Sequence, residues 1–422
     1  MEKYKEYRDS GVQWLGEIPS HWKTRRIKWL FREEDEKNVN LSYQLLSFSR
    51  NKGIIPFSAI NEKAPSASDL SKYKVLHVGQ LLENRMQAWS GMFGCSHIEG
   101  CVSPDYSVFS PYDSSVLTEY YACLFRTPIF VQQFANASKG IGDGFNRLYT
   151  PQFQRICAIA PPTIEQHSIV SYLDTKCSLL DTLLSNKEKQ ISLLQEMKQR
   201  VIADAVTRGV NPNIKFKATN IPWLPEIPEH WKIKPIRSLL REVTEKSETG
   251  EEELLSLSQY TGISYKKDAK NTGMFDAEST IGYKKVYPGQ FVMNIMLAWN
   301  GSYAVSGLQG IISPAYCVFD FVSDCDKLYY HYLLRLGIYS GAFKTASRGI
   351  IDSRLRLYPN RFYPFPIICP PIDEQKAIVS YITERTSKID TLIEKLTKEI
   401  ECVKEYKQRL ISDVVTGQVK VC

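Results

Sequence analysis

Two long stretches of the chain, residues 161–208 and 370–422, space their apolar residues at alternating four- and three-residue intervals. Each opens with a double proline and then continues for more than forty residues without proline or glycine. Such spacing is typical of a coiled-coil seam, so each stretch is predicted to form one long helix. The seam residues of the first are Ile169, Leu173, Cys177, Leu180, Leu184, Ile191, Leu194, Val201 and Ala205, with Lys187 and Lys198 at two further positions. Those of the second are Ile378, Ile382, Thr386, Ile389, Ile393, Leu396, Ile400, Val403, Leu410 and Val414.

The residues before each long helix have a mixed pattern. Short apolar runs bounded by turn-forming residues predict strands. In the first half these runs are residues 43–48, 73–78, 106–109 and 156–159. Apolar residues at three- and four-residue spacing predict a helix in residues 115–134 and another in residues 327–343. Each half therefore begins with a predicted compact α/β domain.

The two halves are copies of each other. Residues 14–23 recur as residues 223–232 with eight of ten positions identical, at an offset of 209. Residues 161–208 match residues 370–417 at 22 of 48 positions. The chain is therefore a tandem duplication. Since each repeat is one structural unit, the two halves are expected to have the same architecture.

The predicted fold is α+β, with two α/β domains in tandem and a long helix after each. The expected boundaries are residues 1–160 for the first domain, 161–208 for its helix, 209–369 for the second domain, and 370–422 for the second helix and tail. A helix of about 44 residues is about 66 Å long. Each helix would leave its apolar stripe in water unless the two packed on each other. We therefore expect an antiparallel coiled coil with pseudo-two-fold symmetry.

The positive charge lies on the domains. The chain of 422 residues has 53 Lys and Arg against 46 Asp and Glu, which gives a formal net charge of +7. Residues 1–160 carry 19 basic and 16 acidic side chains, residues 209–370 carry 19 and 15, and the two helical segments are neutral. Two basic domains on a neutral spacer suit contact with double-stranded DNA. The alternative is that the surplus charge only keeps the protein in solution.

Basic and amide side chains in the loops around the strands are the candidate DNA contacts. Arg, Asn and Gln can read base edges, whereas Lys mostly positions the phosphate backbone. The candidates are Arg50, Lys52, Asn84, Arg85, Lys139 and Arg147 in the first domain, and Gln259, Lys266, Lys267, Asn294, Arg348, Arg354 and Arg356 in the second. The tryptophans Trp14, Trp22 and Trp89 and their copies are expected to anchor the core, and His21 and His230 are expected to pack and form hydrogen bonds.

The sequence contains no recognisable catalytic centre or cofactor motif. A nucleotide-binding glycine loop and a nuclease signature are both lacking. Cys95, His97 and Cys101 do not have the spacing of a zinc site, and apolar or small residues replace all three in the second copy. We expect a chain that is not an enzyme and binds no metal or cofactor. No run of 18 apolar residues occurs, so the chain is expected to be cytoplasmic and to make no membrane contact.

Three duplicated motifs identify a family that the chain resembles. They are Trp-Leu-Gly-Glu-Ile-Pro-x-His-Trp, with proline in place of glycine in the second copy, Ser-Pro-x-Tyr, and the Pro-Pro-x-x-Glu-Gln opening of each long helix. Their first copies begin at Trp14, Ser103 and Pro161. In this order they resemble the specificity subunit of type I restriction-modification systems, over nearly the whole chain.

The resemblance implies two target recognition domains, each reading one half of a bipartite DNA sequence. It further implies that the helices set the spacer and dock the modification subunits, expected to be two, and that restriction subunits join the full complex. S-adenosylmethionine, ATP and magnesium would belong to those partners. The alternative is a stand-alone DNA-binding or scaffold protein that has no connection with methyltransferases.

Overall fold

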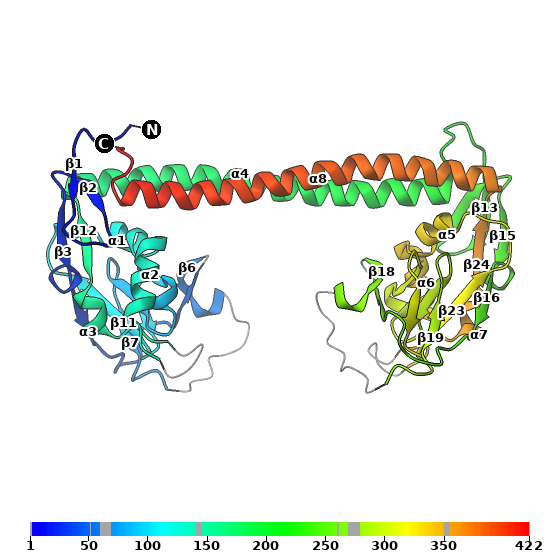
Figure 1. The fold of residues 1–422 in the computed structure, drawn as a ribbon, viewed down its shortest axis with the longest axis horizontal. Coiled ribbons are helices and arrows are strands. Elements are labelled where there is room, and N and C mark those ends of the chain that lie inside the picture. The colour runs from blue at the N-terminus through cyan, green and yellow to red at the C-terminus, as the bar shows by residue number, and fades with distance from the viewer. Residues whose placement is uncertain are drawn as a thin grey trace. The chain divides into compact units, whose positions relative to one another are not determined.

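The computed structural model describes residues 2–50, 52–59, 69–140, 146–259, 261–268, 279–349 and 355–421. The chain divides into two compact units. Unit 1 comprises residues 1–188 and 397–422, and unit 2 comprises residues 189–396. Each unit therefore holds one mixed domain, here called domain 1 or domain 2, together with part of each long helix (Figure 1).

Domain 1 is built from short strands and short helices. Its strands are β1 (Tyr7–Asp9), β2 (Glu17–Pro19), β3 (Lys23–Arg26), β4 (Phe31–Glu34), β5 (Leu46–Ser49), β6 (Gly53–Pro56), β7 (Lys74–Leu76), β8 (Leu81–Asn84), β9 (Phe93–Cys95), β10 (Gly100–Val102), β11 (Tyr106–Pro111) and β12 (Cys157–Ala160). Its helices are α1 (Thr118–Leu124), α2 (Pro128–Ala137) and α3 (Thr150–Arg155), with 3-10 turns η1 (Ile27–Trp29), η2 (Phe57–Ala59) and η3 (Ala88–Ser90). The long helix α4 (Thr163–Arg208) follows.

Domain 2 repeats this order. Its strands are β13 (Phe216–Ile221), β14 (Leu224–Pro228), β15 (Lys232–Pro235), β16 (Leu240–Val243), β17 (Leu255–Ser258), β18 (Gly262–Tyr265), β19 (Lys284–Val286), β20 (Phe291–Asn294), β21 (Tyr303–Val305), β22 (Gly310–Ile312), β23 (Tyr316–Phe321) and β24 (Pro366–Cys369). Its helices are α5 (Lys327–Leu334), α6 (Gly337–Ala346) and α7 (Pro359–Phe362), with 3-10 turns η4 (Ile236–Ser238), η5 (Lys266–Asp268) and η6 (Ala298–Asn300). The long helix α8 (Ile372–Val415) follows.

Each domain is organised around a four-stranded antiparallel sheet. The strand order is β4-β11-β8-β9 in domain 1 and β16-β23-β20-β21 in domain 2. Two-stranded ladders surround the sheet, including the hairpins β5-β6 and β17-β18. Aromatic side chains fill the core on one face of each sheet: Phe93 contacts Phe125, Phe134 and Phe153 in domain 1. The apolar runs that predicted strands thus lie at or next to β5, β7, β11 and β12.

The two long helices pack on each other in antiparallel order within each unit. In unit 1, Ile169 near the start of α4 shares a core with Val414 near the end of α8. In unit 2, Val206 near the end of α4 shares a core with Ile378 near the start of α8. This confirms the predicted coiled coil.

The two lysines at seam positions of α4 form ion pairs with α8. Lys187 contacts Glu399 at 2.5 Å in unit 1, and Lys198 contacts Asp390 at 2.7 Å in unit 2. The repeat equivalent of the second pair is Lys407 with Asp181, at 2.5 Å in unit 1. Polar residues can therefore stand in the seam because the facing helix supplies a carboxylate to each.

The sequence predicts one continuous helix in residues 115–134 and another in residues 327–343. Both predictions are wrong, because each range contains two separate helices. Thr127 has an extended conformation between α1 and α2, with ψ of 149°. The proline that follows it disfavours the α-helical conformation at the preceding residue. Leu336 is extended in the same way between α5 and α6, with ψ of 142°, although glycine replaces the proline there.

Candidate nucleic-acid interface

The hairpin β5-β6 of domain 1 carries two of the predicted contact residues at its tip. Arg50 and Lys52 are exposed. The Arg50 guanidinium donates to the carbonyl oxygen of Ser90 at 3.0 Å and to the Ser90 hydroxyl at 2.6 Å. Since Ser90 belongs to η3, the hairpin tip lies against this turn.

The hairpin β17-β18 of domain 2 places Gln259 at the equivalent tip position. The Gln259 carbonyl accepts a hydrogen bond from Arg335 at 2.6 Å. Lys266 and Lys267 lie at the other end of the hairpin, in η5, because Leu255 pairs with Tyr265 there. Lys267 forms an ion pair with Glu253 at 2.8 Å. The structure therefore separates the two lysines from Gln259.

Asn84 and Asn294 occupy the same place in the two domains, at the ends of β8 and β20. Both are buried, with 9% and 3% of their surface exposed. The Asn84 side-chain oxygen accepts from the backbone of Met86 at 3.2 Å, and that of Asn294 accepts from Met296 at 3.0 Å. Each asparagine thus shapes the turn that follows its strand. Contact of these amides with bases stays a prediction.

Arg85 follows Asn84 and is half-buried. Its guanidinium donates to the backbone carbonyls of Pro104 at 2.6 Å and of Asp105 at 2.9 Å. These carbonyls belong to the Ser-Pro-x-Tyr motif. The guanidinium therefore links that motif to the end of β8, and its counterpart in domain 2 is the uncharged Ile295.

Each domain has a pair of basic residues at equivalent positions. Lys139 and Arg147 pair through two backbone hydrogen bonds of 2.9 Å, and Arg348 and Arg356 do so at 3.0 and 2.9 Å. All four residues except the half-buried Arg147 are exposed. Arg354, also predicted as a contact, lies outside the described residues.

Several of the predicted residues come together around the connection from β8 to η3. The hairpin tip reaches it through Arg50 and Ser90. The cation pair reaches it through Leu148, whose amide donates to the carbonyl of Arg85 at 3.1 Å. In domain 2, Leu357 donates in the same way to Ile295 at 2.9 Å. Domain 1 thus gathers a hairpin tip, a turn and a cation pair, and domain 2 places its cation pair at the equivalent turn, a composition that suits recognition of nucleic acid.

The duplicated motifs themselves form a clasp between each domain and its own long helix. Glu165, in the first turn of α4, accepts hydrogen bonds from Tyr4 at 2.8 Å and Trp22 at 3.0 Å, and contacts His21 at 2.6 Å. Glu374, in the first turn of α8, contacts His230 at 2.6 Å and accepts from Trp231 at 2.8 Å. The histidines therefore form the hydrogen bonds that the sequence predicted.

The pKa of Glu165 lies below its ordinary value. Partial burial acts to raise it, but the hydrogen bonds from Trp22, Tyr4 and His21 favour the ionised carboxylate and outweigh the burial. The neighbouring Gln166 accepts from the backbone amide of Leu117 at 2.9 Å and so extends the clasp to the segment before α1. The sequence showed each motif in two copies but not that the motifs touch.

A tyrosine in each domain also holds the end of the other long helix. Tyr120 of α1 donates to the carbonyl of Val415, the last residue of α8, at 2.8 Å. Tyr329 of α5 donates to the carbonyl of Val206 in α4 at 2.9 Å. The last carbonyls of a helix lack partners within it, so each tyrosine satisfies a group that burial would otherwise leave unpaired.

The tryptophans divide between core and surface. Trp22 and Trp231 are fully buried, and Trp14 packs edge-on against Phe130 at 5.0 Å, as predicted for core anchors. Trp89 is 37% exposed and lies in η3, beside the hairpin tip. Its indole nitrogen donates to the carbonyl of Met86 at 3.0 Å.

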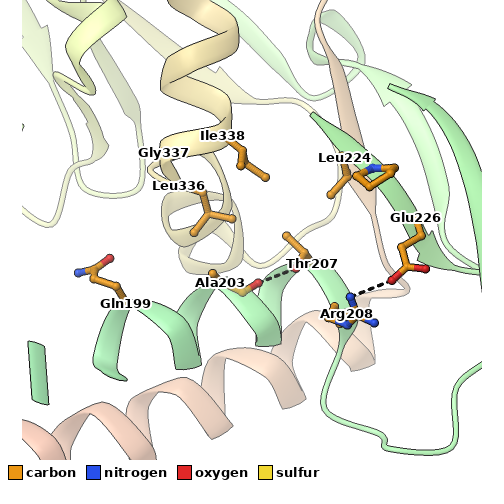
Figure 2. Close-up of a pocket in the computed structure, with 10 residues that line it drawn as sticks. Gln199, Ala203, Thr207, Arg208, Leu224, Glu226, Leu336, Gly337 and Ile338 are labelled. Carbon is orange, nitrogen blue, oxygen red and sulfur yellow. Dashed lines mark hydrogen bonds and ion pairs between the residues drawn. The ribbon is translucent and has the colours of Figure 1, made fainter. Parts of the chain in front are cut away.

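A cavity of about 560 Å³ lies in unit 2 between the end of α4, β14 and the start of α6 (Figure 2). Its lining is mostly apolar and includes Ala203, Leu224 and Ile338. The two charged residues that line it, Arg208 and Glu226, form an ion pair at 2.8 Å. This composition suits packing better than acid–base chemistry.

Two further features bear on the sequence predictions. None of the described helices combines the length and the apolar composition needed to cross a membrane. Within the described ranges, no three His, Cys, Asp or Glu side chains group as metal ligands would. Cys101 is buried, and its thiol contacts the carbonyl of Tyr43 at 3.5 Å.

The chain is a two-domain protein with paired long helices. Each α/β domain is clasped to the start of one long helix and holds the end of the other. No model of a known protein family matches the chain. The chain is 28% identical over 298 residues to the type I restriction enzyme MjaVIII specificity subunit of Methanocaldococcus jannaschii, an alignment that spans 66% of each protein. It is 22% identical over 478 aligned positions to the putative type I restriction enzyme MjaX specificity subunit of the same organism, which covers 100% of this chain and 99% of that one.

Two solved structures share the fold. One is from a study of complex assembly and conformational transition of the type I restriction-modification system, with a TM-score of 0.68 and 13% identity over 95% of this chain and 99% of that chain. The other is the HsdS subunit of Thermoanaerobacter tengcongensis, with a TM-score of 0.53 and 15% identity over 95% and 98%. Along its whole length the chain is thus similar to proteins named as specificity subunits of type I restriction enzymes, and it shares their fold.

Proposed function

We propose that the chain recognises DNA within a type I restriction-modification complex, and that each domain reads one half of a bipartite target. One observation carries this proposal: both domains place a hairpin tip, a turn and a pair of cations at equivalent positions. The cations Lys139 and Arg147 recur as Arg348 and Arg356, while Arg50 at the tip is replaced by Gln259. Shared cations suit the phosphate backbone, and differing tips suit different half-sites.

The long helices are proposed to set the spacer between the half-sites and to dock two modification subunits. Helices of 46 and 44 residues are about 69 and 66 Å long. The clasps at Glu165 and Glu374 tie each domain to its helix, so a change in helix length would move the domains rather than be absorbed at the joint. In proteins that read two half-sites, their separation follows from protein geometry.

The chemistry of methylation and cleavage is proposed to belong to partner subunits. Modification subunits would bind S-adenosylmethionine, and restriction subunits would use ATP and magnesium. The chain itself would make and break no covalent bond. Purified chain that alone methylates or cuts a target duplex would contradict this assignment.

Deletion of one heptad from both long helices tests the spacer role. Residues 186–192 and 395–401 are equivalent in the repeat and contain the paired Lys187 and Glu399. Seven residues shorten a helix by about 10 Å, so the preferred spacer should shrink by about three base pairs, with both half-sites unchanged. Methylation of a library of spacer variants by the chain with its modification subunits measures this.

A length-preserving control replaces the exposed residues of the same heptads by alanine and should keep the original spacer. An unchanged spacer in the deletion variant would refute the spacer role. A chain that binds its target tightly and selectively with no modification subunit would instead favour the stand-alone DNA-binding protein.

A further inference from the structure

The hairpins β5-β6 and β17-β18 have different residues at their tips, but the residues on either side of each tip are the same. Ser49 pairs with Gly53 in domain 1, and Ser258 pairs with Gly262 in domain 2. Both glycines have positive φ, 71° and 76°, a conformation that glycine adopts without strain. Residues 50–52 are Arg-Asn-Lys and residues 259–261 are Gln-Tyr-Thr, so no position of the tip is shared.

A single arginine holds each tip from outside the hairpin. The Arg126 guanidinium donates to the carbonyl of Arg50 at 2.8 Å, and that of Arg335 donates to the carbonyl of Gln259 at 2.6 Å. The two arginines are equivalent in the repeat, and each follows the last residue of α1 or α5 closely. Both contacts go to the backbone, so they do not depend on which side chain the tip carries.

The surroundings of the two arginines have changed while the contact has stayed. The residues four positions before them are Ala122 and His331, and those directly after them are Thr127 and Leu336. Arg126 is exposed, whereas Arg335 is half-buried and donates a second hydrogen bond, to the carbonyl of Tyr303 at 2.8 Å. Exposed side chains usually tolerate substitution with small effects on stability, so stability alone gives little reason to retain Arg126.

We propose that Arg126 and Arg335 are positioning residues for specificity, which fix the backbone of a variable hairpin tip so that its side chains meet the bases of one half-site in a constant geometry. This role rests on the proposed DNA-reading function. Base discrimination needs side chains placed within hydrogen-bond distance of base edges. Because the group that is held is a backbone carbonyl, the side chain at this position can change from Arg50 to Gln259 without loss of the contact.

The test is a selection from a duplex library with both half-sites randomised, by the full chain in complex with its modification subunits. Arg126→Ala should weaken discrimination at the bases read by the first tip by about 10- to 100-fold. Preferences in the second half-site should not change. Arg335→Ala should have the converse effect, and Arg126→Lys, which keeps a donor, should retain most of the discrimination.

The matched control is Arg155→Ala, which removes an exposed positive charge at the end of α3. It should leave both half-site preferences intact. Transfer of the second tip into domain 1, by Arg50→Gln, Asn51→Tyr and Lys52→Thr together, should alter the first half-site only. Thermal melting of each variant checks that its domain remains folded.

A uniform loss of affinity in Arg126→Ala, with every base preference retained, would overturn the positioning role and leave the DNA-reading function standing. Loss of preference in both half-sites at once would also overturn it. A wild-type complex that selects no sequence would refute the DNA-reading function itself.

Discussion

Glu83 lies on β8, an inner strand of the main sheet of domain 1, and is fully buried. Within the described part of the chain, neither of its buried carboxylate oxygens has a hydrogen-bond partner. Burial raises its pKa well above the ordinary value, because an ionised carboxylate in this position would lose its hydration. Its counterpart in domain 2 is Met293, which is also fully buried.

Glu83→Met should stabilise domain 1. The unfolded chain releases the proton of this carboxyl above pH 4.5, whereas the folded chain releases it only at a higher pH, so the wild-type domain loses stability as pH rises above 4.5. We expect a gain of about 1–3 kcal/mol at pH 8, shrinking as pH falls towards 4.5. Urea unfolding at several pH values measures it. The reverse change, Met293→Glu, should destabilise domain 2, and a gain that did not vary with pH would contradict the assignment.

His331 gives domain 2 the opposite response to pH. Its ring nitrogen Nδ1 accepts a hydrogen bond from the amide of Val305 at 3.2 Å. Burial, with a smaller contribution from Arg335, lowers the pKa of His331 to about 4. The folded chain therefore holds the ring neutral, and the equivalent residue in domain 1 is Ala122.

Acidification should destabilise domain 2 through His331. The unfolded chain takes up the proton below its ordinary pKa of 6.5, and the folded chain does so only near pH 4. Stability should thus fall between pH 6.5 and 4 by up to about 3 kcal/mol. Hydrogen exchange of the backbone amides in β21 measures this loss of stability. In His331→Gln this part of the pH dependence should vanish, while the exposed control His97→Gln should keep it.

At the scale of elements, the clasp joins strands near the start of each domain to the first turn of its long helix. In Glu165→Ala the indole N–H of the fully buried Trp22 loses its acceptor. We expect unit 1 to lose about 2–4 kcal/mol, with faster hydrogen exchange in residues 2–22. Glu374→Ala should act in the same way on residues 216–231.

The control for the clasp is Glu188→Ala, which removes an exposed carboxylate 3.7 Å from Lys404. Pairs of this kind contribute little, so stability should change by less than about 1 kcal/mol. Equal effects of Glu165→Ala and Glu188→Ala would show that the clasp does not hold the helix.

The elements differ in how far the sequence determines them locally. The long helices could be predicted because their apolar period runs without interruption for more than forty residues. The break before Pro128 has a local signal, the proline itself, but the break before Gly337 has only a glycine, which a helix can tolerate. The boundaries between the short helices therefore could not be predicted without the tertiary structure.

The candidate interface could be predicted in composition but not in contacts. Loop position and charge pointed to Arg50, Lys139 and Arg147. They did not reveal that Arg126 touches Arg50, because the two are 76 residues apart. Nor does chemical type alone distinguish a buried amide such as Asn84 from an exposed one. The repeat held a usable signal, since His21 and Glu165 recur together at the same separation of 144 residues.

At the scale of the whole molecule, the duplication lets each domain serve as a control for the other. Glu83 against Met293 and His331 against Ala122 are natural substitutions in one scaffold. Features shared by both domains, such as the clasps and the tyrosines that hold helix ends, are therefore the ones that the architecture requires.

The two ends of the chain lie together in unit 1, where the amide of Lys420 donates to the carbonyl of Glu2 at 2.9 Å (Figure 1). In unit 2 the corresponding place is crossed by continuous backbone, residues 209–215, between α4 and β13. The same local arrangement thus occurs in both units, between the two chain ends in unit 1 and along continuous backbone in unit 2. The place at which the backbone is interrupted is consequently not essential to this architecture. A circularly permuted chain that begins near residue 210, with a short linker from residue 420 to residue 2, and ends near residue 209 should keep the same neighbours.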